Sequence, residues 1–345
     1  AAPAARFYEE PLLAELLPVA TFSVVILGFV STKEATANKR ILLGRITAIG
    51  LGCQAFGIVI NVGMALWLQS IWGLIFGGIA ANLVKVVLTH TALPGERNRI
   101  DWNWEVFWDI FHFGKYILIS SVAGFFINQG DRAILGKFVS LTELAVYNIG
   151  WLMASVPKTF NRAFGRRILF PLYAEKPPSE SEANRRNIAR ARFVMTGCML
   201  LISLALGLTG DRLIQLLYLP AYHLAGPILV LVVLAGMPSI IVAAYGGLLL
   251  GSGDSRSFTI LLIATATTQT ALLWFGVQAY GLIAAIVAPA LAVIVVYPLN
   301  AILVHKHKGW NPLHDGVYAV VAAVIATIVL IVHQDAIFRV LAGSA

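Results

Sequence analysis

The chain has 345 residues, of which 59% are hydrophobic and only 12% are charged, and its formal net charge is +8. Soluble domains carry about 25% charged residues, so this composition excludes one and predicts an all-α, polytopic membrane bundle. In a basic soluble protein the positive charge would suggest a nucleic-acid partner. In a membrane protein the positions of the basic residues instead indicate which loops face the cytoplasm, so we expect no nucleic-acid partner. The cysteines and histidines lack the spacing of metal ligands, so neither a metal nor another cofactor is expected.

About ten apolar runs follow one another along the chain. In chain order they are 12–31, 41–62, 67–90, 112–139, 144–171, 192–209, 224–250, 257–277, 280–304 and 315–333. A helix of about 20 apolar residues crosses the roughly 30 Å hydrocarbon core. Backbone groups in lipid need internal partners, and runs without alternation exclude a β-barrel, so each run is predicted to be a helix.

Basic residues are concentrated in alternate connections between these runs. The richest connection is 158–192, whereas Arg212 is the only base in the opposite connections. The other bases on the side of 158–192 are Lys33, Lys39, Arg40, Arg45, Arg97, Arg99, Lys115, Arg256, Lys306 and Lys308. The positive-inside rule therefore places 158–192 in the cytoplasm and runs the first helix from outside to inside.

Two parts of the chain resemble each other at an offset of six predicted helices. An aromatic-Gly-Leu-Ile motif occurs at 72–75 and again at 280–283, each just after a short uncharged connection. An even offset keeps both parts in the same orientation, as in transporters built from parallel repeats. We therefore predict a two-lobed exporter architecture that is truncated at its N-terminus, with three further helices ahead of Ala1. Its parts are the back half of an N-terminal lobe at 1–95, a cytoplasmic interfacial linker at 96–111, a complete six-helix C-terminal lobe at 112–306, and the start of an additional helix pair at 312–345.

The run 112–139 carries polar and charged residues in its outer half, namely Asn128, Gln129, Asp131, Arg132 and Lys137. Helical periodicity places Asn128, Asp131 and Arg132 on one face, and Lys137 lies close enough to the end of the span to snorkel. A charge at the bilayer centre costs at least a few kcal/mol, so these groups need compensation. Two interpretations remain open: a structural ion pair, or one wall of a water-filled substrate pathway.

Arg162, Arg166 and Arg167 belong to the basic segment 158–192. They either mark orientation and contact anionic lipid, or form a basic entrance that reaches from the cytoplasm toward an anionic substrate. The segment 101–109 alternates tryptophan with acidic residues and is predicted to lie on the membrane interface. No Gly-rich phosphate loop or nucleophile–base pair is recognisable, so the protein is not expected to be an enzyme.

Several segments together resemble a known family. They are the 128–140 stretch that begins Asn-Gln-Gly-Asp-Arg, the 144–150 stretch Leu-Ala-Val-Tyr-Asn-Ile-Gly, Pro157, and Phe-Pro-Leu-Tyr-Ala at 170–174. The chain resembles the polysaccharide-transport (Wzx-like) flippases for O-antigen and exopolysaccharide. These belong to the multidrug/oligosaccharidyl-lipid/polysaccharide exporter superfamily.

The resemblance implies two six-helix lobes around a cationic cavity in the bacterial cytoplasmic membrane. Members move undecaprenyl-pyrophosphate-linked oligosaccharides to the outer leaflet by alternating access, often coupled to H⁺ or Na⁺. On this chain Arg132 and Lys137 would face the cavity, and Arg162 would meet the pyrophosphate from the cytoplasmic side.

Two other functions remain as alternatives. A cation-coupled multidrug antiporter would need acids in its pathway, and Asp131 is the only deep one. A membrane polysaccharide polymerase or glycosyltransferase would need a large outer loop, whereas the outer loops here are short. The excess of bases over acids in the spans favours the flippase.

Overall fold

A computed structural model describes residues 1–34, 43–94 and 102–343, which form helices and contain no strand. The predicted all-α architecture is confirmed. Six of the helices in the described residues are long and apolar enough to cross a membrane, namely Thr47–Leu68, Ile71–Thr91, Glu182–Leu217, Pro220–Gly251, Ser255–His305 and Pro312–Val332. The chain is therefore a multi-pass membrane protein.

The chain divides into two compact units, 1–107 and 108–345. The boundary falls in the first turns of helix α6 (Trp104–Phe138), so part of the predicted linker 96–111 is helix. Residues 95–101 lie outside the described residues, as do Lys39, Arg40, Arg97 and Arg99 among the bases that define orientation. The predicted repeat and the four predicted segments remain predictions, because two compact units do not by themselves show a repeat.

The first unit is a small helical bundle. Its described helices are α1 (Ala2–Tyr8), α2 (Leu12–Leu27), α4 (Leu43–Leu68) and α5 (Ile71–Thr91). Helix α5 packs against α4 and α2. A Cβ on Gly73 would lie 2.6 Å from the carbonyl oxygen of Met64, so the α4–α5 contact needs a glycine there. Asn82 donates from Nδ2 to the carbonyl of Ser23 at 3.5 Å and links α5 to α2.

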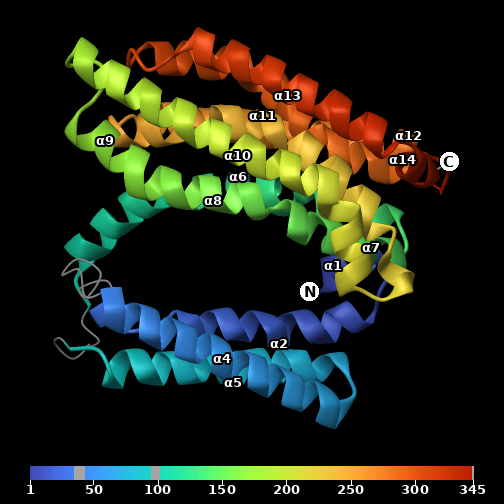
Figure 1. The fold of residues 1–345 in the computed structure, drawn as a ribbon. Helices are drawn as coiled ribbons and strands as arrows, with labels where there is room; N and C mark the ends of the chain where they lie inside the picture. The colour runs from blue at the N-terminus through green and yellow to red at the C-terminus, as the bar shows by residue number, and fades with distance from the viewer. Residues whose placement is uncertain (35–42, 95–101, 344–345) are drawn as a thin grey trace. The chain divides into compact units, whose positions relative to one another are not determined.

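The second unit contains the remaining helices. After α6 they are α7 (Leu141–Ala154), α8 (Val156–Phe164), the π-helical turn η1 (Gly165–Leu169), α9 (Phe170–Glu175), α10 (Glu182–Leu217), the 3₁₀ turn η2 (Pro220–Tyr222), α11 (Ala225–Gly251), α12 (Ser255–His305), α13 (Pro312–Val332) and α14 (Gln334–Gly343). Helix α11 has no charged residue and is apolar on all sides, which is typical of a buried helix. It packs against α7, α10, α12 and α13, and Figure 1 shows α10, α11 and α13 running side by side.

Helix α12 joins two spans that we predicted to be separate. A straight α-helix of its 51 residues would extend about 76 Å, more than twice the roughly 30 Å hydrocarbon core. The helix is interrupted at Gly281, whose φ of 51° and ψ of −132° are not helical. A residue with a side chain adopts this conformation only with strain, so a glycine divides the two spans, two residues beyond the connection that we predicted at 278–279.

The predicted span 144–171 is also broken, into α7, α8, η1 and α9. The break between α7 and α8 falls at Ser155, two residues before Pro157. Proline lacks the backbone N–H that a helix interior requires, which explains the break. The π-helical turn follows directly, and such turns occur frequently at functional sites.

The start of α12 is fixed by Asp254, which lies in the connection from α11. Its carboxylate accepts hydrogen bonds from the backbone N–H of Ser257 at 3.0 Å and the Ser257 hydroxyl at 2.8 Å, and it lies 3.0 Å from Nε2 of His307. These hydrogen bonds favour the charged form and lower the pKa of Asp254 to about 2. The carboxylate therefore holds together the two ends of α12, at its N-cap and just beyond its C-terminus.

Helix α7 approaches α11 closely at Gly150. A Cβ on Gly150 would lie 2.8 Å from the carbonyl oxygen of Ala225, closer than Cβ atoms approach in real structures. The surrounding core includes Leu135, Tyr147 and Leu229, all with exposed fractions of 1% or less. This contact therefore has no room for a larger residue.

We predict that Gly150→Ala destabilises the second unit. Overpacking a core typically costs about 1–3 kcal/mol, which outweighs the gain in helix propensity of about 1 kcal/mol. Gly124→Ala is the matched control, because a Cβ there has no neighbour within 4 Å. Thermal unfolding in detergent should show a lower Tm for Gly150→Ala and an equal or higher Tm for Gly124→Ala. Equal Tm values for the two variants would contradict the close contact.

Candidate functional site

The second unit contains a basic cavity of about 520 Å³. Helix α8 and the η1 turn form one wall, which carries Lys158, Arg162 and Arg166. Helices α11 and α12 supply most of the remaining wall, including Ser239, Ile240, Gly246, Gly247, Leu261, Thr265, Val296 and Asn300. Among the described residues that line the cavity, none is acidic.

The three bases are brought to the cavity by local structure. Arg162 follows Lys158 by four residues and Arg166 follows Arg162 by four, so successive turns present them in one direction. Lys158 extends along α11: its Cε lies 3.1 Å from where a Cβ on Gly236 would be. A larger residue at 236 would displace the lysine. The absence of a side chain on Gly236 thus leaves space for the first base.

Two buried asparagines add polar groups to the cavity lining, Asn161 from α8 and Asn300 from α12. Asn161 is 3% exposed and donates from Nδ2 to the carbonyl of Ile240 at 3.3 Å, and Asn300 is 5% exposed. Within the described part of the chain, the side-chain oxygens of both have no hydrogen-bond donor. Unsatisfied buried acceptors are costly, so each of these oxygens would gain from a hydroxyl or amide donor.

The structure brings two of the predicted site residues together. Arg162 of α8 donates from Nη2 to Oδ1 of Asn128, which lies on α6. Asn128 also donates from Nδ2 to the carbonyl of Gly124 at 2.6 Å, which fixes the orientation of its side chain. Asn128 therefore positions the Arg162 guanidinium at the cavity wall, although it does not itself line the cavity.

Asp131 and Arg132 form a different cluster, which does not line this cavity. Asp131 is 3% exposed and accepts a hydrogen bond of 2.6 Å from the hydroxyl of Tyr147 on α7. Arg132 lies 3.8 Å from the Asp131 carboxylate through Nε, and its guanidinium lies 3.8 Å from the ring centroid of Trp151. These contacts compensate both charges locally, as the structural interpretation of the pair requires.

The other predicted residues lie apart from the cavity. Gln129 is exposed on α6, and Lys137 is half-buried in the last turn of that helix. Arg167 is exposed and lies in the same π-helical turn as Arg166, but only Arg166 lines the cavity. Of the three arginines of the predicted basic entrance, Arg162 and Arg166 thus line the cavity and Arg167 does not.

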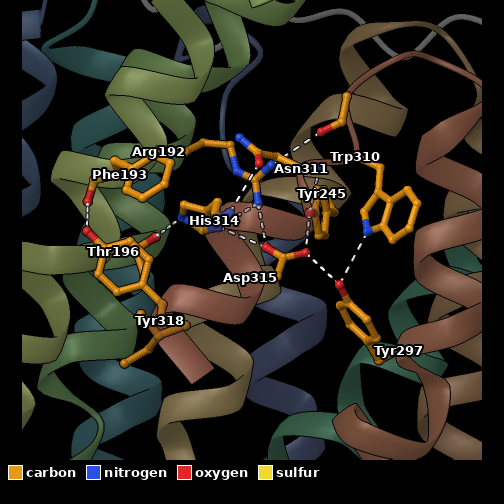
Figure 2. A network of polar contacts seen from close by, with 12 residues as sticks. Arg192, Phe193, Thr196, Tyr245, Tyr297, Trp310, Asn311, His314, Asp315 and Tyr318 are labelled. Carbon is orange, nitrogen blue, oxygen red and sulfur yellow. Dashed lines mark hydrogen bonds and ion pairs between the residues drawn. The ribbon is translucent and has the colours of Figure 1, made fainter. Parts of the chain in front are cut away.

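A second polar network was missed from the sequence. Figure 2 shows it around Asp315 in the first turn of α13. One carboxylate oxygen accepts from Arg192 at 3.2 Å and lies 2.8 Å from Nδ1 of His314; the other accepts from the hydroxyls of Tyr245 and Tyr297. The network therefore connects four helices, α10, α11, α12 and α13.

Residues far apart in the chain form this network, so no local sequence pattern predicts it. Arg192 had been counted only among the cytoplasmic bases, yet it is 2% exposed and its guanidinium lies 4.1 Å from the ring centroid of Tyr245. The one available signal was the pair His314-Asp315 at the start of an apolar run, where an ionisable residue needs a partner.

Comparison with known proteins identifies the family of the chain. Residues 1–225 match a family described as "Polysaccharide biosynthesis protein". The amylovoran biosynthesis protein AmsL of Erwinia amylovora is 23% identical over 239 residues, which are 68% of this chain and 61% of that protein.

Two further relatives match shorter segments. A protein of Haloferax volcanii named "Probable low-salt glycan biosynthesis flippase" is 24% identical over 129 residues, 37% of this chain and 26% of its own length. The teichuronic acid biosynthesis protein TuaB of Bacillus subtilis is 25% identical over 150 residues, 42% of this chain and 30% of its own length. The chain thus spans less than two thirds of each of these relatives.

No solved structure matches the chain. The family match and the relatives confirm the resemblance to polysaccharide-transport proteins, and the name of the Haloferax volcanii relative is that of a transporter. This chain, a multi-pass membrane protein, therefore belongs to the polysaccharide biosynthesis protein family.

Proposed function

We propose that the complete protein is a flippase that moves lipid-linked oligosaccharide units across the cytoplasmic membrane for surface polysaccharide assembly. The observation that carries the proposal is the cavity of the second unit. Its described lining includes Lys158, Arg162 and Arg166 and contains no acidic residue. Three positive charges facing one space favour an anionic ligand. A carrier phosphate or pyrophosphate supplies such charge, and Arg binds phosphate through two parallel hydrogen bonds.

The rest of the cavity suits a sugar attached to that phosphate. Its volume of about 520 Å³ is within the usual range of roughly 300–1,000 Å³ for small-molecule sites. The free side-chain oxygens of Asn161 and Asn300 can accept hydrogen bonds from sugar hydroxyls. In this proposal Asn128 orients Arg162, and the Asp131–Arg132 pair with Tyr147 supports α6 and α7 behind it.

Further details of the proposal come from the resemblance. The carrier is undecaprenyl pyrophosphate, movement occurs by alternating access, and H⁺ or Na⁺ provides the coupling. The basic segment 158–192 faces the cytoplasm, so the cavity receives its ligand from that side. An exporter of cationic drugs is disfavoured, because its pathway would require acids where the described cavity wall carries only bases.

Transport by the full-length protein in vesicles tests the proposal. A fluorescent oligosaccharide would be attached to a polyprenyl carrier through pyrophosphate, and its arrival in the opposite leaflet measured with a membrane-impermeant quencher. We expect transport of this substrate and not of the same oligosaccharide on a neutral polyprenyl ether. Equal transport of both lipids would overturn the proposal, as would transport of neither while a cationic dye is exported.

A further inference from the structure

A second basic cavity, of about 410 Å³, lies away from the proposed substrate cavity. Its bases come from two segments far apart in the sequence: Arg185, Arg186 and Arg192 from α10, and Lys308 from the connection between α12 and α13. Glu182 is the only acid among its described lining residues. Arg185 and Arg186 are more than half exposed, and their contacts with Glu182 are long, at 3.6 and 3.9 Å, so two guanidinium groups remain available to an anion.

Arg192 lines this cavity, and not all of its hydrogen-bond donors have an acceptor within the described chain. Its Nη2 binds Asp315 at 3.2 Å and its Nη1 donates to the carbonyl of Gly309 at 3.3 Å. Its Nε, in a side chain only 3% exposed, has no acceptor within the described chain. Arg185, Arg186 and Lys308 therefore give the cavity a surplus of positive charge, and the buried Nε of Arg192 adds a polar group that the described chain leaves without an acceptor.

An apolar cavity of about 670 Å³ adjoins the basic one. The two share Trp310 and Pro312, and Figure 2 shows the Trp310 indole beside Tyr297, to whose hydroxyl it donates at 3.2 Å. The apolar cavity is lined by α11, α12 and α13, including Leu234, Ile241, Ile294, Ala319 and Ala323. A tryptophan where a basic region meets an apolar one is typical of the level of lipid headgroups.

The length of the apolar cavity corresponds to one leaflet. Along α13 it is lined from Asp315 to Ala326, a helical distance of about 16 Å, which is about half of the roughly 30 Å hydrocarbon core. A ligand with an anionic head and hydrocarbon chains of leaflet length matches both cavities. A free anion would leave the apolar cavity unused.

We infer that these two cavities together bind one anionic phospholipid of the cytoplasmic leaflet. The phosphate headgroup occupies the basic cavity beside Arg185, Arg186 and Arg192, and an acyl chain lies along α13 past Ala319 and Ala323. The basic cavity shares no lining residue with the proposed substrate cavity, whereas the apolar cavity borders it at Val242 and Val293.

Native mass spectrometry of the full-length protein with defined lipids tests the headgroup. We expect phosphatidylglycerol to bind and phosphatidylcholine to bind much more weakly. Arg186→Gln should weaken phosphatidylglycerol binding about fivefold, and Arg185→Gln with Arg186→Gln about thirty-fold. Arg190→Gln is the matched control: Arg190 is exposed one turn further along α10 but lines neither cavity. Equal weakening by Arg186→Gln and Arg190→Gln would overturn the site.

Substitutions that fill the apolar cavity test whether an acyl chain binds there. Ala319→Phe should weaken phosphatidylglycerol binding about tenfold, because the ring occupies the space of several methylene groups. Val320→Phe should leave binding unchanged, because Val320 is exposed on α13 but does not line the cavity. Glycerol phosphate, which has the headgroup without the chains, should not displace the lipid at equal concentration. Its displacement of the lipid, or equal effects of the two Phe variants, would reject a lipid site.

Discussion

Asp315→Ala is expected to lower the free energy of unfolding by roughly 3–5 kcal/mol, the cost of breaking a buried ion pair. Asp315 and Arg192 are 5% and 2% exposed, and their side chains lie 3.2 Å apart. Removal of the carboxylate leaves the guanidinium buried without its counter-charge. It also removes the acceptor for the hydroxyls of Tyr245 and Tyr297, so four helices lose their common polar contact.

A double variant separates the ion pair from the packing around it. Replacement of both partners, Arg192→Met with Asp315→Leu, should be less destabilising than Asp315→Ala alone, because no unpaired charge remains. Unfolding in mixed detergent micelles, followed by circular dichroism, measures both. Asp335→Ala removes the same charge from an exposed position on α14 and should change stability by less than about 0.5 kcal/mol. A similarly small effect of Asp315→Ala would show that the network does not support the bundle.

Arg166→Gln is expected to reduce transport of a pyrophosphate-linked oligosaccharide by roughly tenfold or more. A hydrogen bond between charged partners contributes about 1.5–3 kcal/mol, and each 1.4 kcal/mol corresponds to a factor of ten. Arg166 lines the basic cavity of the second unit, where the proposed function places the phosphate. Its loss leaves Lys158 and Arg162 as the remaining bases of that wall.

Arg167→Gln is the matched control for this prediction. Both arginines are exposed and lie in the same five-residue π-helical turn, so either substitution removes one charge from the same region. Effects through membrane orientation or bulk lipid should therefore be equal. We expect Arg167→Gln to keep transport within about twofold of the unmodified protein. If both variants lose transport equally, the arginines act through orientation or lipid and not through the cavity.

The helices themselves could be predicted from the sequence because the signal is local. About 20 consecutive apolar residues must form a helix in lipid whatever surrounds them. The predicted runs 224–250 and 315–333 accordingly correspond to α11 and α13 within a few residues. The two breaks were less predictable. A proline such as Pro157 commonly interrupts a helix. The division of α12 at Gly281 depends on a backbone conformation that glycine permits but that its presence does not predict.

The polar groups were predicted only in part. Asp131 and Arg132 stood out because both are charged within an apolar run, and the structure gives them local partners in Tyr147 and Trp151. Lys158 was counted only as a base of the cytoplasmic segment, although it lines the cavity. Nothing near it in the sequence indicates this, because Gly236, which leaves room for its side chain, lies on a different helix.

The helical membrane fold and the approximate limits of its spans follow from composition and hydrophobic runs, because each depends on one segment alone. The family follows from the motifs of the sequence and from the match over residues 1–225, again without the structure. Which charges come into contact depends on the tertiary structure. Arg192 and Asp315 are separated by 123 residues, and the bases of α8 face a cavity whose other walls come from α11 and α12. Contacts of this kind depend on how helices far apart in the chain pack against one another. Many residues contribute to the free energy of that packing, so no local pattern predicts it.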